Sequence, residues 1–333
     1  MRIGGKLSPL ADRVYLLVAL CCYATLLAAT ASAGPNEEGV EPALIYEVTH
    51  RASLDPETGL AHVILDLRQD SPLVNSLSFR MPGARYRNIL SDAPVDIEGD
   101  RITWRPAKDG GTLHYQVVIE HHRANGLADT RLTQHWALVE LDHLFPAATT
   151  RAMKGARADA RLVLTAPEGW SIQTPYGFGA GKEFVVDNPQ RHFDQPRGWA
   201  MAGKLAVRRD SVRGRDISVA TPEGEGFRSN DTLSFINWTL PSLVEVFPQL
   251  SPRLLIVSGT EDMWRGGLSG RSSLYMHPGR PLISGNRTST LLHELVHVAS
   301  RMRSDDGADW IVEGIAEYYS LTLLCLLYTS DAA

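Results

Sequence analysis

The sequence predicts an α+β protein in which an antiparallel β-sandwich precedes a domain of mixed helices and strands. Three observations carry this prediction. Short segments of β-like pattern, separated by turn residues, run from residue 43 to about residue 212. After that point the apolar residues take up helical spacing. Two segments near the C-terminus then place histidines and glutamates on one helical face.

The first domain, residues 43–212, is expected to contain short strands. They cover residues 44–50, 61–67, 101–104, 113–119 and 160–165. Turn signals such as Asp55-Pro56 and Asp109-Gly110-Gly111 separate them, and this spacing is typical of an antiparallel sandwich. We assign four tryptophans of this domain to its core: Trp104, Trp136, Trp170 and Trp199.

The second domain, residues 213–324, begins with a helix expected over residues 233–247 and interrupted or kinked at Pro241. A buried strand follows over residues 253–258, and a second strand over residues 272–276 is expected near a sheet edge. Two further helical segments, 290–298 and 310–319, complete the domain.

The most informative residues are His293, Glu294 and His297, which form the motif H-E-x-x-H. Residues four apart lie on one face of a helix, so the two histidines can point at the same spot. Two imidazoles so placed can bind Zn²⁺, and the intervening glutamate can take a proton from a metal-activated water. Ser289 is among the residues expected to cap this helix. The sequence therefore predicts one zinc ion bound here.

A zinc site of this kind needs a third protein ligand. Glu313 and Glu317 lie four residues apart, so a helix places both carboxylates on one face. The surrounding segment is mostly apolar, and we therefore expect it to be largely buried. Because a buried carboxylate is costly unless it is paired or bound to a metal, both glutamates are candidates. The alternative is that they are solvated surface residues.

H-E-L-V-H followed by W-x-x-E-G-x-A-x-Y-Y resembles the gluzincin zinc metallopeptidases, in particular the aminopeptidase-N-like and glycyl-aminopeptidase-like families. The resemblance implies an all-β domain followed by a zincin (thermolysin-like) α/β catalytic domain. It implies that His293, His297 and Glu313 bind Zn²⁺ and that Glu294 is the general base. We expect Glu317 to accept a hydrogen bond from one of the ligand histidines.

Two features depart from the aminopeptidase N pattern. Fifteen residues separate His297 from Glu313, which is fewer than in that family, and a turn expected at residues 304–307 can absorb the difference. The glutamate that holds the substrate's free amine in that family is absent from the segment G-G-L-S-G at residues 266–270. The resemblance thus supports zinc peptidase chemistry better than strict aminopeptidase specificity.

We therefore expect an aminopeptidase-like enzyme that hydrolyses peptide or protein substrates, with Glu294 as general base for the metal-activated water. An extended substrate could pair with the strand near Leu274. One alternative is a zinc endopeptidase, which the missing amine-binding glutamate favours. The other is a non-catalytic binding protein that keeps the zinc fold, against which the presence of Glu294 argues.

Residues 1–33 have the pattern of a secretory signal peptide, with basic residues before an apolar run and an A-x-A site at residues 31–33. Residues 34–42 form a linker. We expect export to the periplasm or secretion, without stable membrane insertion after cleavage; an uncleaved N-terminal anchor is the alternative. Cleavage would remove Cys21 and Cys22 and change the net charge from −5 to −7. A mildly acidic chain without a basic stripe is a poor nucleic-acid binder.

Residues 325–333 resemble translated sequencing-adapter read-through, the alternative being a short native tail. We therefore expect the native sequence to end near Leu324 and the gene to continue. Gluzincins normally continue into a helical subdomain that supplies a Tyr or His to stabilise the oxyanion. We expect that the catalytic domain is incomplete at its C-terminus and that the chain as given has weak activity at most. The sequence does not specify an oligomeric state.

Overall fold

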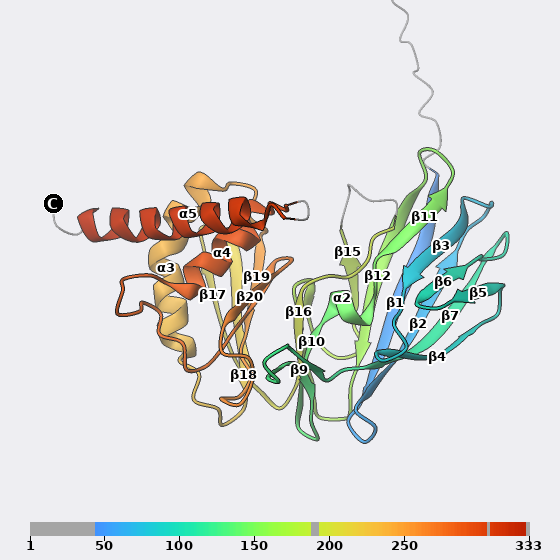
Figure 1. Ribbon diagram of the computed structural model, residues 1–333, viewed down its shortest axis with the longest axis horizontal. Helices are drawn as coiled ribbons and strands as arrows, with labels where there is room; N and C mark the ends of the chain where they lie inside the picture. Colours follow the sequence, from blue (N-terminus) through green and yellow to red (C-terminus); the bar gives the residue numbers. More distant parts are fainter. Residues whose placement is uncertain (1–43, 188–192, 305–306, 331–333) are drawn as a thin grey trace, which may run out of the picture. The chain divides into compact units, whose positions relative to one another are not determined.

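The computed structural model describes residues 44–187, 193–304 and 307–330. The expected signal peptide and linker lie outside the described residues, as do residues 331–333 of the suspected read-through segment. The described chain is mostly β, with several sheets and few helices (Figure 1).

A six-stranded and a four-stranded sheet form the N-terminal part. The six-stranded sheet has the order β15 (Glu183–Val186), β12 (Arg157–Thr165), β1 (Ile45–Asp55), β2 (Leu60–Arg68), β7 (Gly110–Val118) and β4 (Tyr86–Ser91). The four-stranded sheet has the order β11 (Ala148–Ala152), β3 (Val74–Arg80), β6 (Arg101–Trp104) and β5 (Val95–Glu98). All five strands expected in this part are present.

The expectation of a purely antiparallel arrangement is wrong at one pair of strands. β1 runs parallel to β12, with register partners from Ile45 and Arg157 to Ser53 and Thr165. These two strands are about a hundred residues apart in the sequence. Parallel neighbours need a long crossover, and the intervening strands provide it. Alternation within each strand cannot reveal this pairing because it is the same in parallel and antiparallel strands.

A third sheet, also six-stranded, lies in the middle of the fold. Its order is β14 (Gly177–Phe178), β13 (Ser171–Thr174), β16 (Trp199–Gly203), β10 (Trp136–Glu140), β9 (Ala128–Leu132) and β8 (His121–His122). A single-turn helix, α2 (Leu141–Leu144), follows β10. Strands β10 and β16 are buried on both faces, and their alternate residues enter two different hydrophobic cores.

The fourth sheet carries the longer helices. Its order is β17 (Leu205–Val212), β18 (Arg215–Pro222), β19 (Arg253–Val257), β21 (Ser273–Met276) and β20 (Gly267–Gly270). Helices α3 (Ser229–Val246), α4 (Thr290–Ser300) and α5 (Asp309–Ser330) gather beside it (Figure 1). The helix expected over residues 233–247 is thus confirmed as α3, which continues through Pro241.

Three hydrophobic cores lie between the sheets and helices. One lies among the N-terminal sheets and one face of the middle sheet, and it includes Trp104 and Trp170. A second lies between the middle sheet and the fourth sheet and contains Trp136, Trp199 and Tyr275. A third joins the other face of the fourth sheet to α3, α4 and α5. The assignment of the four tryptophans to core positions is therefore confirmed.

Two expectations concern the fourth sheet: the position of the domain border and the position of the edge strand. The expected domain border at residues 212 and 213 falls in the hairpin of β17 and β18, whose strands are paired from Leu205 and Pro222 to Val212 and Arg215. The strand near Leu274 is not an edge strand, because β21 lies between β19 and β20 and Leu274 is fully buried. The edge is β20 instead. A strand of four residues containing two glycines gives little periodicity from which to predict it.

Within the described residues, no helix combines the length and apolar character needed to cross a membrane.

Candidate metal centre

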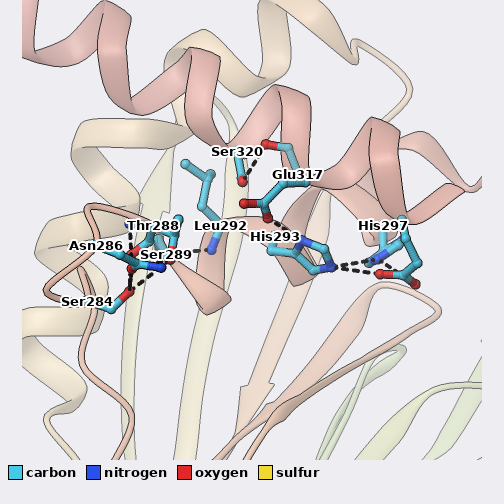
Figure 2. A network of polar contacts seen from close by, with 10 residues as sticks. Ser284, Asn286, Thr288, Ser289, Leu292, His293, His297, Glu317 and Ser320 are labelled. Atoms are coloured by element: carbon cyan, nitrogen blue, oxygen red, sulfur yellow. Dashed lines mark hydrogen bonds and ion pairs between the residues drawn. The ribbon is translucent and has the colours of Figure 1, made fainter. Parts of the chain in front are cut away.

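Helix α4 holds the H-E-x-x-H motif in a well-capped and well-anchored position. Ser289 is extended, and its side-chain oxygen accepts a hydrogen bond from the Leu292 N–H at 3.2 Å. Ser284, Asn286 and Thr288 form a hydrogen-bonded loop just before this cap (Figure 2). Leu291, Leu295 and Val296 of α4 are fully buried in the core between the fourth sheet and the helices. The helix is thereby fixed at its start and along one face.

His293 and His297 direct their Nε2 atoms toward each other and toward Glu313 of α5. The two Nε2 atoms lie 3.1 Å apart. His293 Nε2 is 3.2 Å from one carboxylate oxygen of Glu313, and His297 Nε2 is 3.5 Å from the other. The structure therefore brings together the three residues that the resemblance implied as zinc ligands, and their ligand atoms all lie within 4.8 Å of one another.

The spacing of these atoms fits a tetrahedral zinc site. With metal–ligand distances of about 2.0–2.1 Å, two corners of a tetrahedron are about 3.4 Å apart. The two Nε2 atoms are 3.1 Å apart, and each lies 3.2 Å or 3.5 Å from its nearer Glu313 oxygen, Oε2 for His293 and Oε1 for His297, which is close to that value. Two imidazoles and one carboxylate also match the donor set of catalytic zinc sites. Burial lowers the pKa of His297, which favours the neutral imidazole that binds metal, although Glu313 opposes this.

Glu317 lies on the other side of the His293 ring. Its Oε2 is 3.5 Å from His293 Nδ1, the nitrogen that faces away from His297. Figure 2 shows His293 between Glu317 and His297. This is the position from which a carboxylate can fix the tautomer and orientation of a ligand histidine.

Glu294 lies against the edge strand β20 and lines the same cavity as His293, His297 and Glu313. Ser269 of β20 lies close enough to its carboxylate to lower the pKa of Glu294. A Cβ atom on Gly267 would lie only 2.5 Å from Glu294 Cγ, so glycine is needed there for close approach. Burial, together with the charge of Glu313, raises the pKa of Glu294, whereas the charge of His293 and the nearby Ser269 lower it.

An open cavity joins these groups. Its volume is about 570 Å³, and its walls include Ser269, Glu294, His297 and Glu313. The cavity gives solvent and an extended ligand access to the cluster. Ser269 and Gly267 were not predicted as functional residues. In the sequence, the G-G-L-S-G segment indicated only that the amine-binding glutamate is absent. The contact of this segment with Glu294 depends on tertiary packing and could not be predicted from local pattern.

The expectation that the Glu313 segment is largely buried is wrong. The side chains of Glu313 and Glu317 are 60% and 50% exposed, and Trp310 and Tyr318 are also exposed. Helix α5 contacts the core through a narrow stripe of Ala316, Ser320, Leu323 and Leu324. Tyr319 is partly buried beside this stripe and packs against Phe247, whereas Ile311, Leu321 and Leu326 are exposed. An apolar composition therefore did not determine burial here.

Comparison with solved structures places this fold among known ones. The chain resembles an aminopeptidase N family protein from Idiomarina loihiensis, with a TM-score of 0.56 and 16% identity over 76% of this chain and 47% of that one. The chain thus spans about half the length of that protein. It also resembles an M1 zinc metallopeptidase from Deinococcus radiodurans, with a TM-score of 0.51 and 13% identity over 87% of this chain and 71% of that one.

A variant of the same Deinococcus radiodurans enzyme, solved with a Tyr-Ser-Ala substrate, matches with a TM-score of 0.51 and 14% identity. This match covers 87% of this chain and 71% of that enzyme. At these identities the likeness is one of fold. No protein-family model and no curated protein sequence matches the chain.

Proposed function

We propose that the chain is a zinc-dependent peptidase whose catalytic part contains α4, α5 and β20. The observation that carries the proposal is the convergence of His293 Nε2, His297 Nε2 and the Glu313 carboxylate at distances suited to one tetrahedral ion. Zinc, when bound there, would supply a Lewis acid that polarises a peptide carbonyl and makes a water molecule more acidic. The fold likeness to zinc metallopeptidases supports this choice.

In this proposal each side chain has a separate task. His293, His297 and Glu313 hold the ion, and Glu317 orients His293 through Nδ1. Glu294, which shares the cavity with them, takes the proton from the attacking water and passes it to the leaving amine. Strand β20 is the edge on which an extended peptide can pair, which replaces our expectation for β21.

Aminopeptidase-like cleavage is the first candidate for specificity, on the resemblance of the two motifs. Endopeptidase activity is the second, and Ser269 favours it. This residue stands in the segment where aminopeptidases carry an amine-binding glutamate, and it lines the same cavity as Glu294. Comparing cleavage of a free and an N-acetylated peptide of the same sequence separates the two, since only an aminopeptidase requires the free amine.

The central test uses two substitutions in the zinc-loaded chain. Glu294→Gln should lower kcat by at least about a thousandfold while bound zinc, measured by atomic absorption, stays near one per chain. Glu313→Ala should instead lose the metal, because it removes a ligand. Full activity in Glu294→Gln would refute the mechanism. If the full-length, zinc-loaded protein cleaves no peptide in a diverse library, the non-catalytic binding protein is favoured.

We also infer from the pattern of residues 1–33 that the protein is exported. Mass spectrometry of the N-terminus after expression in a host with a secretory system tests this. Cleavage after Ala33 supports export, whereas an intact N-terminus in the membrane fraction supports the uncleaved anchor.

A further inference from the structure

A second, smaller pocket opens beside the candidate metal centre and is rich in arginine. Its volume is about 230 Å³, below the roughly 300–1,000 Å³ of sites for whole small molecules. Ser269, His297 and Arg303 are among the residues that line both this pocket and the metal cavity. The remaining walls include Arg197, Arg271 and Arg301. The size and position suit one substituent of a larger substrate held at the metal centre.

The charges of two of these arginines are not balanced by acidic side chains in the described part of the chain. Arg197 is paired, because its Nε donates to Asp142 at 2.6 Å. Arg271 donates to a backbone carbonyl, that of Asp187, at 3.0 Å. No ion pair to Arg271 or Arg301 occurs among the described residues. Arg271 and Arg301 line the same pocket, and burial together with the positive charge of Arg271 holds the pKa of Arg301 below its usual value.

The backbone around the pocket adopts an unusual conformation at two positions. Arg301, at the C-terminal cap of α4, has a φ of 55°, and Ser272, in the turn between β20 and β21, has a φ of 52°. Glycine is the residue that usually ends a helix in this left-handed conformation. Strained residues of this kind cluster at functional sites. Arg301 and Ser272 therefore hold backbone conformations that glycine adopts more readily.

We propose that this pocket binds a carboxylate of the substrate through Arg271 and Arg301. The preferred substrate is then a peptide with a carboxylate close to the cleaved bond, supplied by an Asp or Glu side chain or by the peptide's own C-terminus. Guanidinium groups recognise carboxylates through paired, charge-assisted hydrogen bonds, which makes them suited to this role. The inference rests on the proposed peptidase function for its substrate class.

The test compares matched peptides with the zinc-loaded chain. One pair differs by Glu against Gln next to the cleaved bond, and a second pair has a free or an amidated C-terminus. We expect kcat/KM to be about tenfold or more higher for the carboxylate member of one pair. Discrimination in the first pair identifies the side chain as the source of the carboxylate, and discrimination in the second identifies the C-terminus. Equal rates within both pairs would overturn the proposal.

Arg301→Gly is the informative variant, because glycine favours the backbone conformation at residue 301 and the fold should persist. This substitution should reduce the kcat/KM preference for the carboxylate peptide to about threefold or less. Arg213→Gly is the matched control: Arg213 is exposed, has a φ of 51° and lies in the β17–β18 turn, away from the pocket. This control should keep the full preference. A preference unchanged in Arg301→Gly and also in Arg271→Gln would exclude the pocket.

Binding measurements separate this inference from the peptidase proposal. Fluorescence anisotropy with the Glu and Gln peptides needs no turnover, so it can be done on Glu294→Gln. Stronger binding of the Glu peptide that is lost on adding Arg301→Gly supports the pocket even if no cleavage occurs, in which case only the peptidase proposal fails. If the protein cleaves peptides but shows no preference for a carboxylate, the peptidase proposal stands and only the proposal of a carboxylate-binding pocket fails.

Discussion

At the scale of single residues, the two nitrogens of His293 face two different glutamates of α5. Nε2 lies near Glu313 and His297, and Nδ1 lies near Glu317. This difference in position suits separate tasks for the two carboxylates, which helical spacing by itself presents as equivalent candidates. A ligand contributes a bond to the metal, whereas an orienting partner acts only through the histidine.

Glu317→Gln should therefore weaken zinc binding by about 10–100-fold without abolishing it. The amide keeps the size of the side chain but loses the charge that orients the His293 ring. Zinc affinity measured by competition with a chromophoric chelator checks this. Glu313→Gln should have the larger effect, and the reverse order would show that the third ligand is Glu317.

His50 provides a residue-scale prediction about pH. It is fully buried between Phe145 and Phe193, and its Nε2 contacts the Asp194 carbonyl at 2.9 Å. Burial lowers its pKa from 6.5 to about 3 despite that carbonyl. The unfolded chain then binds a proton that the folded chain does not, so stability is lost as the pH falls from about 6.5 toward 3.

His50→Gln should remove this contribution. Between pH 7 and pH 4.5 the wild-type chain should lose about 2–3 kcal/mol of unfolding free energy that the variant does not lose. Urea unfolding of both proteins at the two pH values measures the difference. Parallel pH profiles would mean that His50 is not held neutral by burial.

At the scale of elements, the edge strand β20 and helix α4 approach closely enough to require glycine. Gly267→Ala should push Glu294 out of place, because the new Cβ would meet Glu294 Cγ. We expect kcat to fall by about tenfold or more with zinc content unchanged, since small displacements of a catalytic group are costly. Gly285→Ala, where a Cβ meets no atom within 4 Å, is the control. Normal turnover in Gly267→Ala would argue against Glu294 as the base.

At the scale of the whole molecule, strands β10 and β16 link the N-terminal sheets to the sheet that carries the helices. Leu138 is fully buried in the core shared with the fourth sheet, whereas its neighbour Val139 enters the other core. One strand thus serves two cores, which favours cooperative unfolding of both.

Leu138→Ala should lower the unfolding free energy by about 2–5 kcal/mol. It should shift the urea midpoint of zinc release together with that of far-UV circular dichroism. Leu90→Ala, at a residue that is 68% exposed on β4, should shift neither appreciably. A Leu138→Ala protein that loses β signal but keeps its zinc-release midpoint would show that the two parts unfold independently.

The local pattern of the sequence determined much of this protein. The β-rich first part, α3, β19 and the H-E-x-x-H helix all follow from periodicity and capping, which act between residues close in the chain. The two ligand histidines are also a local feature, because one helical turn separates them.

Tertiary structure alone decided the remainder, because it depends on contacts between distant segments. It paired β1 with β12, made β20 the edge strand, left the glutamates of α5 exposed and placed Glu313 and Glu317 on opposite sides of His293. It also brought Arg271 and Arg301 into one pocket. Twenty-nine residues separate those two arginines in the sequence, and no periodic pattern extends across a strand, a loop and a helix to predict that they line one pocket.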